Sequence, residues 1–138
     1  MTRRYLWPAI ALSVAGLLAR RCCTFVIVRG HSMNPTLVDG QRVLAIRRPR
    51  YRTGDVIVFW TQGGSGTPGD PDYLVKRVLA TAGQPRPELF AGSALPAVVP
   101  AGRLAVVGDN AEHSSDSRQL GYIPVSDVRG RVRGLRPS

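Results

Sequence analysis

Hydrophobic and polar positions divide the chain into one long apolar run followed by several short ones. Residues 5–19 are apolar and uncharged, with arginines before them at 3–4 and after them at 20–21. As a helix this run is about 22 Å long, against ~30 Å for the hydrocarbon core of a bilayer. The arginines after it leave a poor site for removal of a leader peptide. We therefore predict one uncleaved, single-pass transmembrane helix within a basic-flanked anchor at 1–23; the alternative is an ordinary buried N-terminal helix.

Beyond the anchor, the apolar runs are short and rich in β-branched residues, and glycine, proline or aspartate separates them. They predict strands at residues 24–29, 41–47, 56–60, 73–81, 103–107 and 128–132. The 56–60 run is apolar on both faces and should be central. Residues 61–71 read as a flexible loop, and residues 82–102 as a proline-rich irregular segment with a short element at 88–90. The prediction is a mainly β fold with a single β-rich domain over 24–138.

The composition favours one domain with a short appendage, because 138 residues leave no room for a second full domain. The net charge of +10 favours an anionic partner, either lipid head groups or nucleic acid. Cys22 and Cys23 are adjacent and form no disulfide framework, and with His31 and His113 they have no zinc-site spacing. We therefore predict neither a metal nor a cofactor.

Eighteen of the 19 basic residues are arginine, and Lys76 is the only lysine. Arginine keeps its proton in proteins, whereas a desolvated lysine can lose it. Because strand side chains alternate, Leu74, Lys76 and Val78 share one face. These apolar neighbours should lower the pKa of Lys76. The alternative is that a GC-rich genome replaced lysine by arginine and one lysine remained by chance.

Ser32 is the candidate nucleophile. It lies between Gly30 and Pro35, where a strand should enter a turn that exposes the hydroxyl. A serine needs a nearby base, and Lys76 would form a serine/lysine dyad with it. His31 should point to the opposite side of extended chain. His113 stays open as an alternative base.

A polar loop at residues 108–118 concentrates turn formers and hydroxyl groups, and pairs Asp116 with Arg118. On its own, this loop could equally be a solvated surface segment. A catalytic role for this loop is favoured only in combination with the motifs that precede it.

Four stretches, taken in order, resemble the type I signal peptidases and their mitochondrial inner-membrane relatives, which are serine/lysine endopeptidases. They are GHSMNPTL at 30–37, GDVIV at 54–58, VKRV at 75–78, and PAG at 100–102 with VGDN at 107–110, SSDSR at 114–118, Gly121 and IP at 123–124. One short motif would be weak support, but four in the family's order are strong. After the lysine, ATAGQ at 80–84 departs from the family's pattern of glycine followed by Pro-Gly-Asp.

The resemblance assigns roles to individual residues. It implies that Ser32 is the nucleophile, Lys76 the general base and Ser114 the hydroxyl that orients the lysine amine, with Asp116 and Arg118 as a bracing pair. The Ser32 backbone N–H would donate to the oxyanion. Supporting positions are Asp109 and Asn110 of the C-terminal signature, and Gly30, which stands where some members have a hydroxyl-bearing serine.

The resemblance also implies an acyl-enzyme mechanism on the outer face of a bacterial plasma membrane. Substrates would be exported preproteins with an apolar targeting segment and small residues one and three positions before the cut, so the partners would be preproteins and membrane lipid, without nucleic acid. The sequence does not indicate a partner subunit. A specialised maturation protease for one precursor is an alternative, as is a basic membrane-tethered binding module without catalysis.

Overall fold

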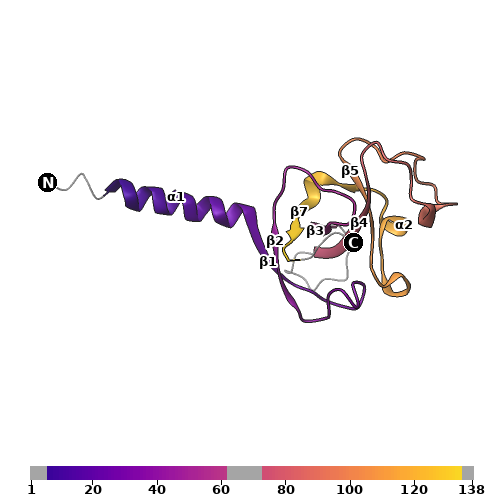
Figure 1. The fold of residues 1–138 in the computed structure, drawn as a ribbon, viewed down its shortest axis with the longest axis horizontal. Helices are drawn as coiled ribbons and strands as arrows, with labels where there is room; N and C mark the ends of the chain where they lie inside the picture. Colours follow the sequence, from indigo (N-terminus) through magenta and orange to yellow (C-terminus); the bar gives the residue numbers. More distant parts are fainter. Residues whose placement is uncertain (1–5, 62–72, 135–138) are drawn as a thin grey trace.

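We describe the fold from a computed structural model, which describes residues 6–61 and 73–134. The chain is mainly β, as predicted, with a helix that stands away from the globular part (Figure 1). The strands are β1 (Cys23–Ile27), β2 (Arg42–Ile46), β3 (Val56–Trp60), β4 (Tyr73–Thr81), β5 (Arg103–Val107), β6 (Ile123–Pro124) and β7 (Val128–Val132). Almost all of the predicted flexible loop at 61–71 lies outside the described residues.

The N-terminal helix α1 (Leu6–Cys22) covers the predicted apolar run and continues into β1 without a connecting loop. Side chains at positions 10–17 are exposed all around it. Within residues 6–61 and 73–134, no helix combines the length and the hydrophobicity needed to cross a membrane.

The seven strands form one antiparallel, curled sheet in the order β1-β2-β7-β3-β4-β5-β6. The last strand in the sequence, β7, lies in the middle, where it pairs with β2 on one side and with β3 on the other. It therefore joins the β1–β2 hairpin to the four-stranded remainder of the sheet.

Two hydrophobic cores cover opposite faces of this sheet. Alternation along β3 sends Val56 and Val58 into the first core, and Ile57 and Phe59 into the second. β3 is buried on both faces, as its apolar run predicts. The first core also contains Val26, Val28, Met33, Leu37, Val43, Ala45, Val75 and Val132, and the second contains Tyr51, Val78, Leu104, Val106, Ile123 and Val128.

Residues 82–102 form a compact extension with little regular structure, as predicted. It contains the short 3₁₀ helix η1 (Glu88–Phe90) and one bridge between Pro85 and Val98. Phe90 and Val99 fix it to a third small core. Residues 80–84, ATAGQ, where the sequence departs from the family pattern, form a turn. The Gln84 N–H donates to the Thr81 carbonyl at 3.0 Å, and Gln84 Oε1 accepts from the Thr81 N–H at 2.7 Å.

Candidate active site

Ser32 lies in the turn segment that follows β1, and the flanking residues hold this segment in place. Met33 and Leu37 are buried in the first core, whereas Ser32 is half-buried. Gly30 has a φ of 79°, a conformation that glycine adopts without strain, and its N–H donates to the Asp39 carboxylate at 2.6 Å. The serine is thus presented from a turn whose neighbours are anchored in the core.

Lys76 lies in the middle of β4, directly opposite Ile57 of β3, and only 2% of it is exposed. Leu74 and Val78 pack on the same side of the sheet, as alternation predicts. Burial lowers the pKa of Lys76 from 10.5 to about 8, against the opposing influence of the negative charges of Asp116 and Asp109. A substantial fraction of this lysine is therefore neutral at mildly alkaline pH.

Gly108 brings the serine turn, the lysine strand and the C-terminal loop to one place. Arg77 pairs with Val107 at the end of β5, so Lys76 and Gly108 are the next residues along the two segments. A Cβ atom at Gly108 would lie 2.6 Å from the Ser32 carbonyl oxygen and would collide with the Ser114 side chain. The missing side chain at this position is what allows Ser32 and Ser114 to approach the lysine strand.

Asn110 fastens the C-terminal loop to the serine turn. Its backbone N–H donates to the Ser32 carbonyl at 2.9 Å, and its side-chain amide donates to the His31 carbonyl at 3.1 Å. The two predicted motifs, far apart in sequence, therefore share direct hydrogen bonds.

Asp109 links the same segments through its carboxylate. Arg77 binds it with two hydrogen bonds, Nε to Oδ1 at 2.8 Å and Nη2 to Oδ2 at 2.7 Å, and the Thr36 hydroxyl donates to Oδ2 as well. Burial favours a higher pKa for Asp109, but the hydrogen bonds from Arg77 and Thr36 and the charges of Arg77 and Lys76 outweigh it, so the pKa is lowered. Arg77 also donates to the Gly54 carbonyl at 2.9 Å.

Sequence reasoning did not assign roles to Arg77 or Thr36. Both stand inside motifs that were singled out, VKRV and GHSMNPTL. Their common partner, Asp109, is 32 residues from Arg77 and 73 from Thr36. The only sequence feature that pointed to Arg77 was its position directly after Lys76.

Asp116 is fully buried and binds Arg118 through two hydrogen bonds, at 2.9 and 2.8 Å. It also accepts from the Arg118 backbone N–H at the start of the short helix α2 (Ser117–Leu120). Ser117 Oγ accepts from the Val106 N–H at 2.8 Å, which fixes this loop to β5. The pairing of Asp116 with Arg118 expected from the sequence is present, and the Asp116 charge acts on Lys76, whose pKa it tends to raise.

Ser114 Oγ is buried and has no hydrogen-bond partner among the described residues. A buried hydroxyl without a partner is unfavourable, so it is available to a group that enters or reorients in the site. Both histidines, His31 and His113, are exposed, and within the described chain neither ring hydrogen-bonds to Ser32.

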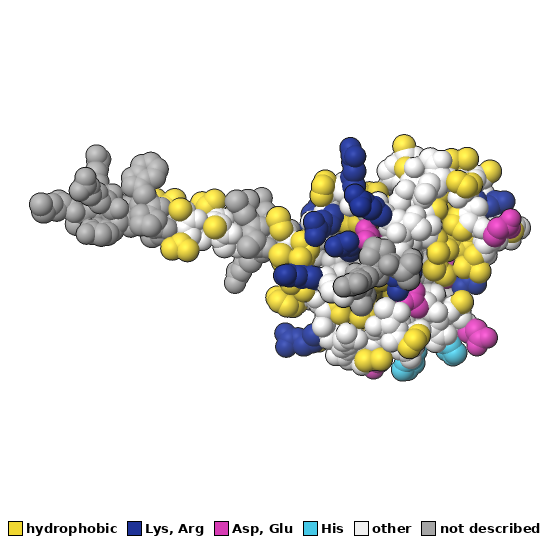
Figure 2. Space-filling model, in the orientation of Figure 1, with side chains coloured by type: hydrophobic (Ala, Val, Ile, Leu, Met, Phe, Trp, Pro, Cys, Tyr) yellow, Lys and Arg dark blue, Asp and Glu magenta, His cyan; other side chains and the backbone are white. Residues whose placement is uncertain are grey.

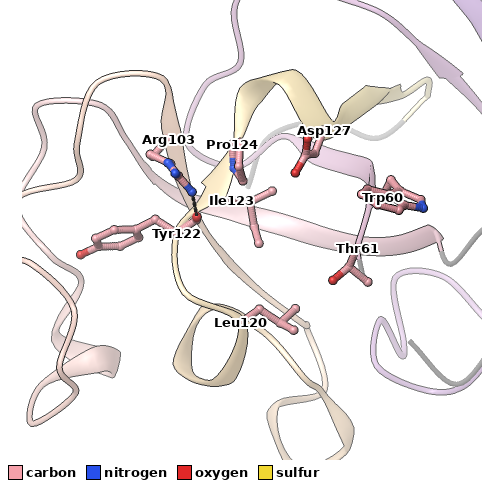
Figure 3. A pocket seen from close by; sticks show the side chains of 8 residues that line it. All are labelled: Trp60, Thr61, Arg103, Leu120, Tyr122, Ile123, Pro124 and Asp127. Atoms are coloured by element: carbon pink, nitrogen blue, oxygen red, sulfur yellow. Dashed lines mark hydrogen bonds between the residues drawn. The ribbon is translucent and has the colours of Figure 1, made fainter. Parts of the chain in front are cut away.

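A separate cavity of about 260 Å³ lies at the β5–β6 edge of the sheet (Figure 3). It is lined by Trp60, Thr61, Arg103, Leu120, Tyr122, Ile123, Pro124 and Asp127, and Arg103 donates to the Tyr122 carbonyl at 3.1 Å. None of the predicted catalytic residues lines it. In the described part of the chain, no group of three or more His, Cys, Asp or Glu side chains could hold a metal ion.

Comparison with known proteins agrees with this arrangement of motifs. The model of the family described as signal peptidase, peptidase S26, matches residues 2–85 and 87–135. The chain belongs to this family. The resemblance predicted from the sequence is thereby confirmed, and the protein is a hydrolase that acts on peptide bonds.

Similar proteins include signal peptidases of Staphylococcus aureus and Bacillus licheniformis. The chain is 29% identical to signal peptidase IB of Staphylococcus aureus (strain COL) over 159 aligned positions, covering 90% of this chain and 83% of the relative. It is 30% identical to signal peptidase I of Bacillus licheniformis over 152 positions, covering 88% and 82%. Both alignments extend over nearly all of the chain and most of each relative.

Proposed function

We propose that this S26 peptidase is a membrane-anchored serine endopeptidase that removes signal peptides from exported preproteins, with Ser32 as nucleophile and Lys76 as general base. The observation that carries the proposal is the setting of Lys76. The only lysine of the chain is buried next to Arg77, whose cross-strand partner Val107 precedes Gly108. Ser32 and Ser114 pack against Gly108. Its lowered pKa makes a neutral amine accessible near physiological pH.

In the proposed reaction, Lys76 Nζ takes the proton of Ser32 Oγ as this oxygen attacks the scissile carbonyl carbon. The Ser32 N–H donates to the resulting oxyanion. The ammonium of Lys76 then protonates the leaving amine, and the C–N bond breaks to give an acyl-enzyme. A water molecule, deprotonated by Lys76, then attacks the ester carbonyl carbon. The bond from the acyl carbon to Ser32 Oγ breaks, Lys76 returns the proton to Oγ, and the product acid leaves.

Three further groups have supporting roles in this proposal. Ser114, whose buried hydroxyl lacks a partner, orients the Lys76 amine. The ion pair of Asp116 with Arg118 holds the loop that carries Ser114. Asp109, bound by Arg77 and Thr36, keeps the serine turn and the lysine strand in register.

The anchor and the substrates belong to the same proposal. Helix α1 is 17 residues long, about 25 Å, and its uncharged part is residues 6–19. Local thinning of the bilayer, together with arginines at 20–21 that are long enough to reach its head groups, would accommodate a short apolar segment. The β-rich domain then lies on the outer face of the plasma membrane, where the cleavage sites of exported preproteins emerge. We also expect the substrates to have small residues one and three positions before the cleavage site.

The family assignment decides between the functional classes left open by the sequence. A basic binding module without catalysis does not agree with membership of a peptidase family. The breadth of specificity, general or limited to one precursor, is a property of the substrate pockets and is tested by the same cleavage assay with several precursors.

The decisive experiment compares the parent with Ser32→Ala, Lys76→Ala and Lys76→Arg in reconstituted membranes. Cleavage of a preprotein should fall by at least about 10³-fold in each variant, because removing a member of such a dyad leaves only residual catalysis. Parent activity should rise with pH through an inflection near the lysine pKa of about 8. A reactive-serine probe should label the parent far faster than Lys76→Ala. Substantial activity in Lys76→Arg would refute Lys76 as the base, since arginine keeps its proton.

A further inference from the structure

Most arginines of this chain extend into solvent, but a few fold back against the protein. Figure 2 shows dark-blue side chains that project from the part of the domain that α1 joins. Among the arginines whose side chains are described, four are half-buried: Arg77, Arg86, Arg118 and Arg131. Arg86 donates to backbone carbonyls, whereas each of the other three binds a carboxylate. Two of these three carboxylates, Asp116 and Asp109, act on Lys76.

Arg118 binds both oxygens of the first carboxylate. Asp116 is fully buried, with Arg118 Nε donating to Oδ1 at 2.9 Å and Nη2 to Oδ2 at 2.8 Å. The adjacent Ser117 ties this segment to Val106 of β5, the strand that pairs with β4. The Asp116 charge is the larger of the two that favour a higher pKa for Lys76. Because Asp116 is shielded from water, Arg118 is the cation that balances its charge.

Arg77 holds the second carboxylate on the other side of the sheet. Side chains alternate along β4, so Arg77 points to the face opposite Lys76. It binds both oxygens of Asp109, at 2.8 and 2.7 Å. The Asp109 charge also favours a higher pKa for Lys76, but its influence is smaller than that of Asp116. Pairing with Arg77 therefore draws the Asp109 charge away from the lysine.

The elements packed around Lys76 carry few other charged or titratable groups. In the described part of the chain these are Tyr51, Asp55, Arg131 and the exposed His31, Glu112 and His113. Asp55 is bound by Arg131 at 3.2 Å and by the Arg52 N–H at 2.9 Å. Within the described residues, no ion pair joins Lys76 to a carboxylate. The lysine thus lies near two carboxylates that arginines already occupy.

We propose that Arg77 and Arg118 are positioning residues of the peptidase reaction, each holding one carboxylate so that neither becomes the counter-ion of Lys76. The amine then carries no salt bridge that would keep it protonated, and it can accept the proton of Ser32. Without one of these arginines, the freed carboxylate would pair with the Lys76 ammonium, which would lose its proton only at higher pH. This inference rests on the proposed function for the role of Lys76 as base, but its first test does not use catalysis.

The single lysine permits a direct titration. The full chain, with Ser32→Ala to prevent catalysis, is prepared in detergent micelles with lysine labelled by ¹³C at Cε, so that Lys76 gives the only lysine signal. The chemical shift of this signal is followed as a function of pH, and its midpoint should match the Lys76 pKa of about 8. In Arg118→Gln and in Arg77→Gln the midpoint should rise by at least about 1 pH unit, because a nearby opposite charge stabilises the ammonium.

Three further variants show whether the carboxylate causes the shift, even where a lone carboxylate weakens the fold. Asp116→Asn should lower the midpoint below that of the parent, since it removes a negative charge and leaves Arg118. Combining Arg118→Gln with Asp116→Asn removes both charges and should cancel the rise. Arg131→Gln is the matched control, because it breaks the ion pair with Asp55, which does not act on Lys76; its midpoint should equal that of the parent.

The second readout is cleavage by chains that retain Ser32. At pH 7, Arg118→Gln should cleave a preprotein about tenfold more slowly than the parent, because a rise of about 1 unit in the lysine pKa reduces the neutral amine tenfold. On the alkaline plateau its rate should approach that of the parent. A rate reduced by the same factor at every pH would indicate a purely structural role and refute the inference.

The outcomes separate this inference from the proposed function. If the parent cleaves a preprotein but neither Arg118→Gln nor Arg77→Gln moves the lysine midpoint, the counter-ion role is refuted and the peptidase proposal stands. A rise in only one of the two variants refutes the role of the other arginine. A rise that persists when Asp116→Asn is added to Arg118→Gln refutes Asp116 as its cause. Midpoints that move as expected in a chain that cleaves nothing support the counter-ion arrangement and contradict the proposed function.

Discussion

Lys76 should destabilise the fold that contains it, and Lys76→Met tests this directly. The pKa of Lys76 falls from 10.5 to about 8 in the folded protein. At about 1.36 kcal/mol for each pKa unit, holding the protonated lysine in this site costs ~3 kcal/mol near pH 7. Methionine has a similar shape and no charge, and Lys76 is almost fully buried. The free energy of unfolding of Lys76→Met should therefore exceed that of the parent by ~3 kcal/mol at pH 7, apart from a pH-independent difference in packing.

The pH dependence of this difference has a definite sign. Between pH 8 and 10.5 the unfolded lysine is protonated while the folded one is increasingly neutral. The unfolded state then binds more protons, so parent stability rises with pH in this window. The advantage of Lys76→Met should shrink to ~2 kcal/mol at pH 9 and nearly vanish above 10.5.

Urea unfolding of the full chain in detergent, from pH 6 to 10.5, measures both quantities. Arg50→Met, which removes an exposed cation, is the control and should show a small difference independent of pH. Two results would show that burial does not lower the pKa of Lys76. One is a Lys76→Met variant no more stable than the parent at pH 7, and the other is a stability difference between them that stays constant with pH. The proposal that Lys76 acts as a neutral general base would then lose its support.

Two further variants test how the site is assembled. Gly108→Ala should reduce cleavage and reactive-serine labelling by at least about 10²-fold, because the new methyl displaces Ser114 or the Ser32 carbonyl. Gly16→Ala is the control for labelling, since its added Cβ meets no atom and its φ is not positive. A fully active Gly108→Ala would refute the close approach of Ser32 and Ser114 to Gly108. Asp109→Asn should lower the free energy of unfolding at neutral pH by ~2 kcal/mol or more, since it breaks a partly buried ion pair with Arg77. Because folding lowers the pKa of Asp109, the difference in unfolding free energy between parent and Asp109→Asn should have its full value above pH 3.8. It should shrink as the pH falls through the folded pKa. A difference that stays the same in acid would contradict the ion pair with Arg77.

Much of the fold follows from local patterns. Strands β3, β4, β5 and β7 begin and end where the apolar runs predict, because glycine, proline or polar residues close each run. β6 was not predicted, since two residues that include Pro124 give no alternating pattern. The position of β7 between β2 and β3 was not predictable either. Local hydrophobicity identifies a strand, but its neighbours depend on contacts far apart in sequence.

Local patterns likewise predict one part of the candidate site and not the other. Alternation along β4 correctly predicts the apolar surroundings of Lys76 and the direction of its pKa change. The importance of Gly108 could not be derived from the chain alone. It does not adopt a positive φ, and its role becomes visible only when Ser32 and Ser114 are found against it. The Arg77–Asp109–Thr36 connection is likewise a result of topology.

The place of β7 in the sheet has a consequence for the order in which activity can arise. The hairpin that leads to Ser32 and the strands that carry Lys76 are separate parts of the sheet. Among the described strands, β7 alone pairs with both parts. During synthesis, residues 128–132 emerge after the other described strands, and therefore after both Ser32 and Lys76. If the domain is exported as proposed, a chain caught midway would hold Ser32 and Lys76 without the strand that joins their two parts of the sheet. We then expect proteolytic competence only once β7 has been translocated.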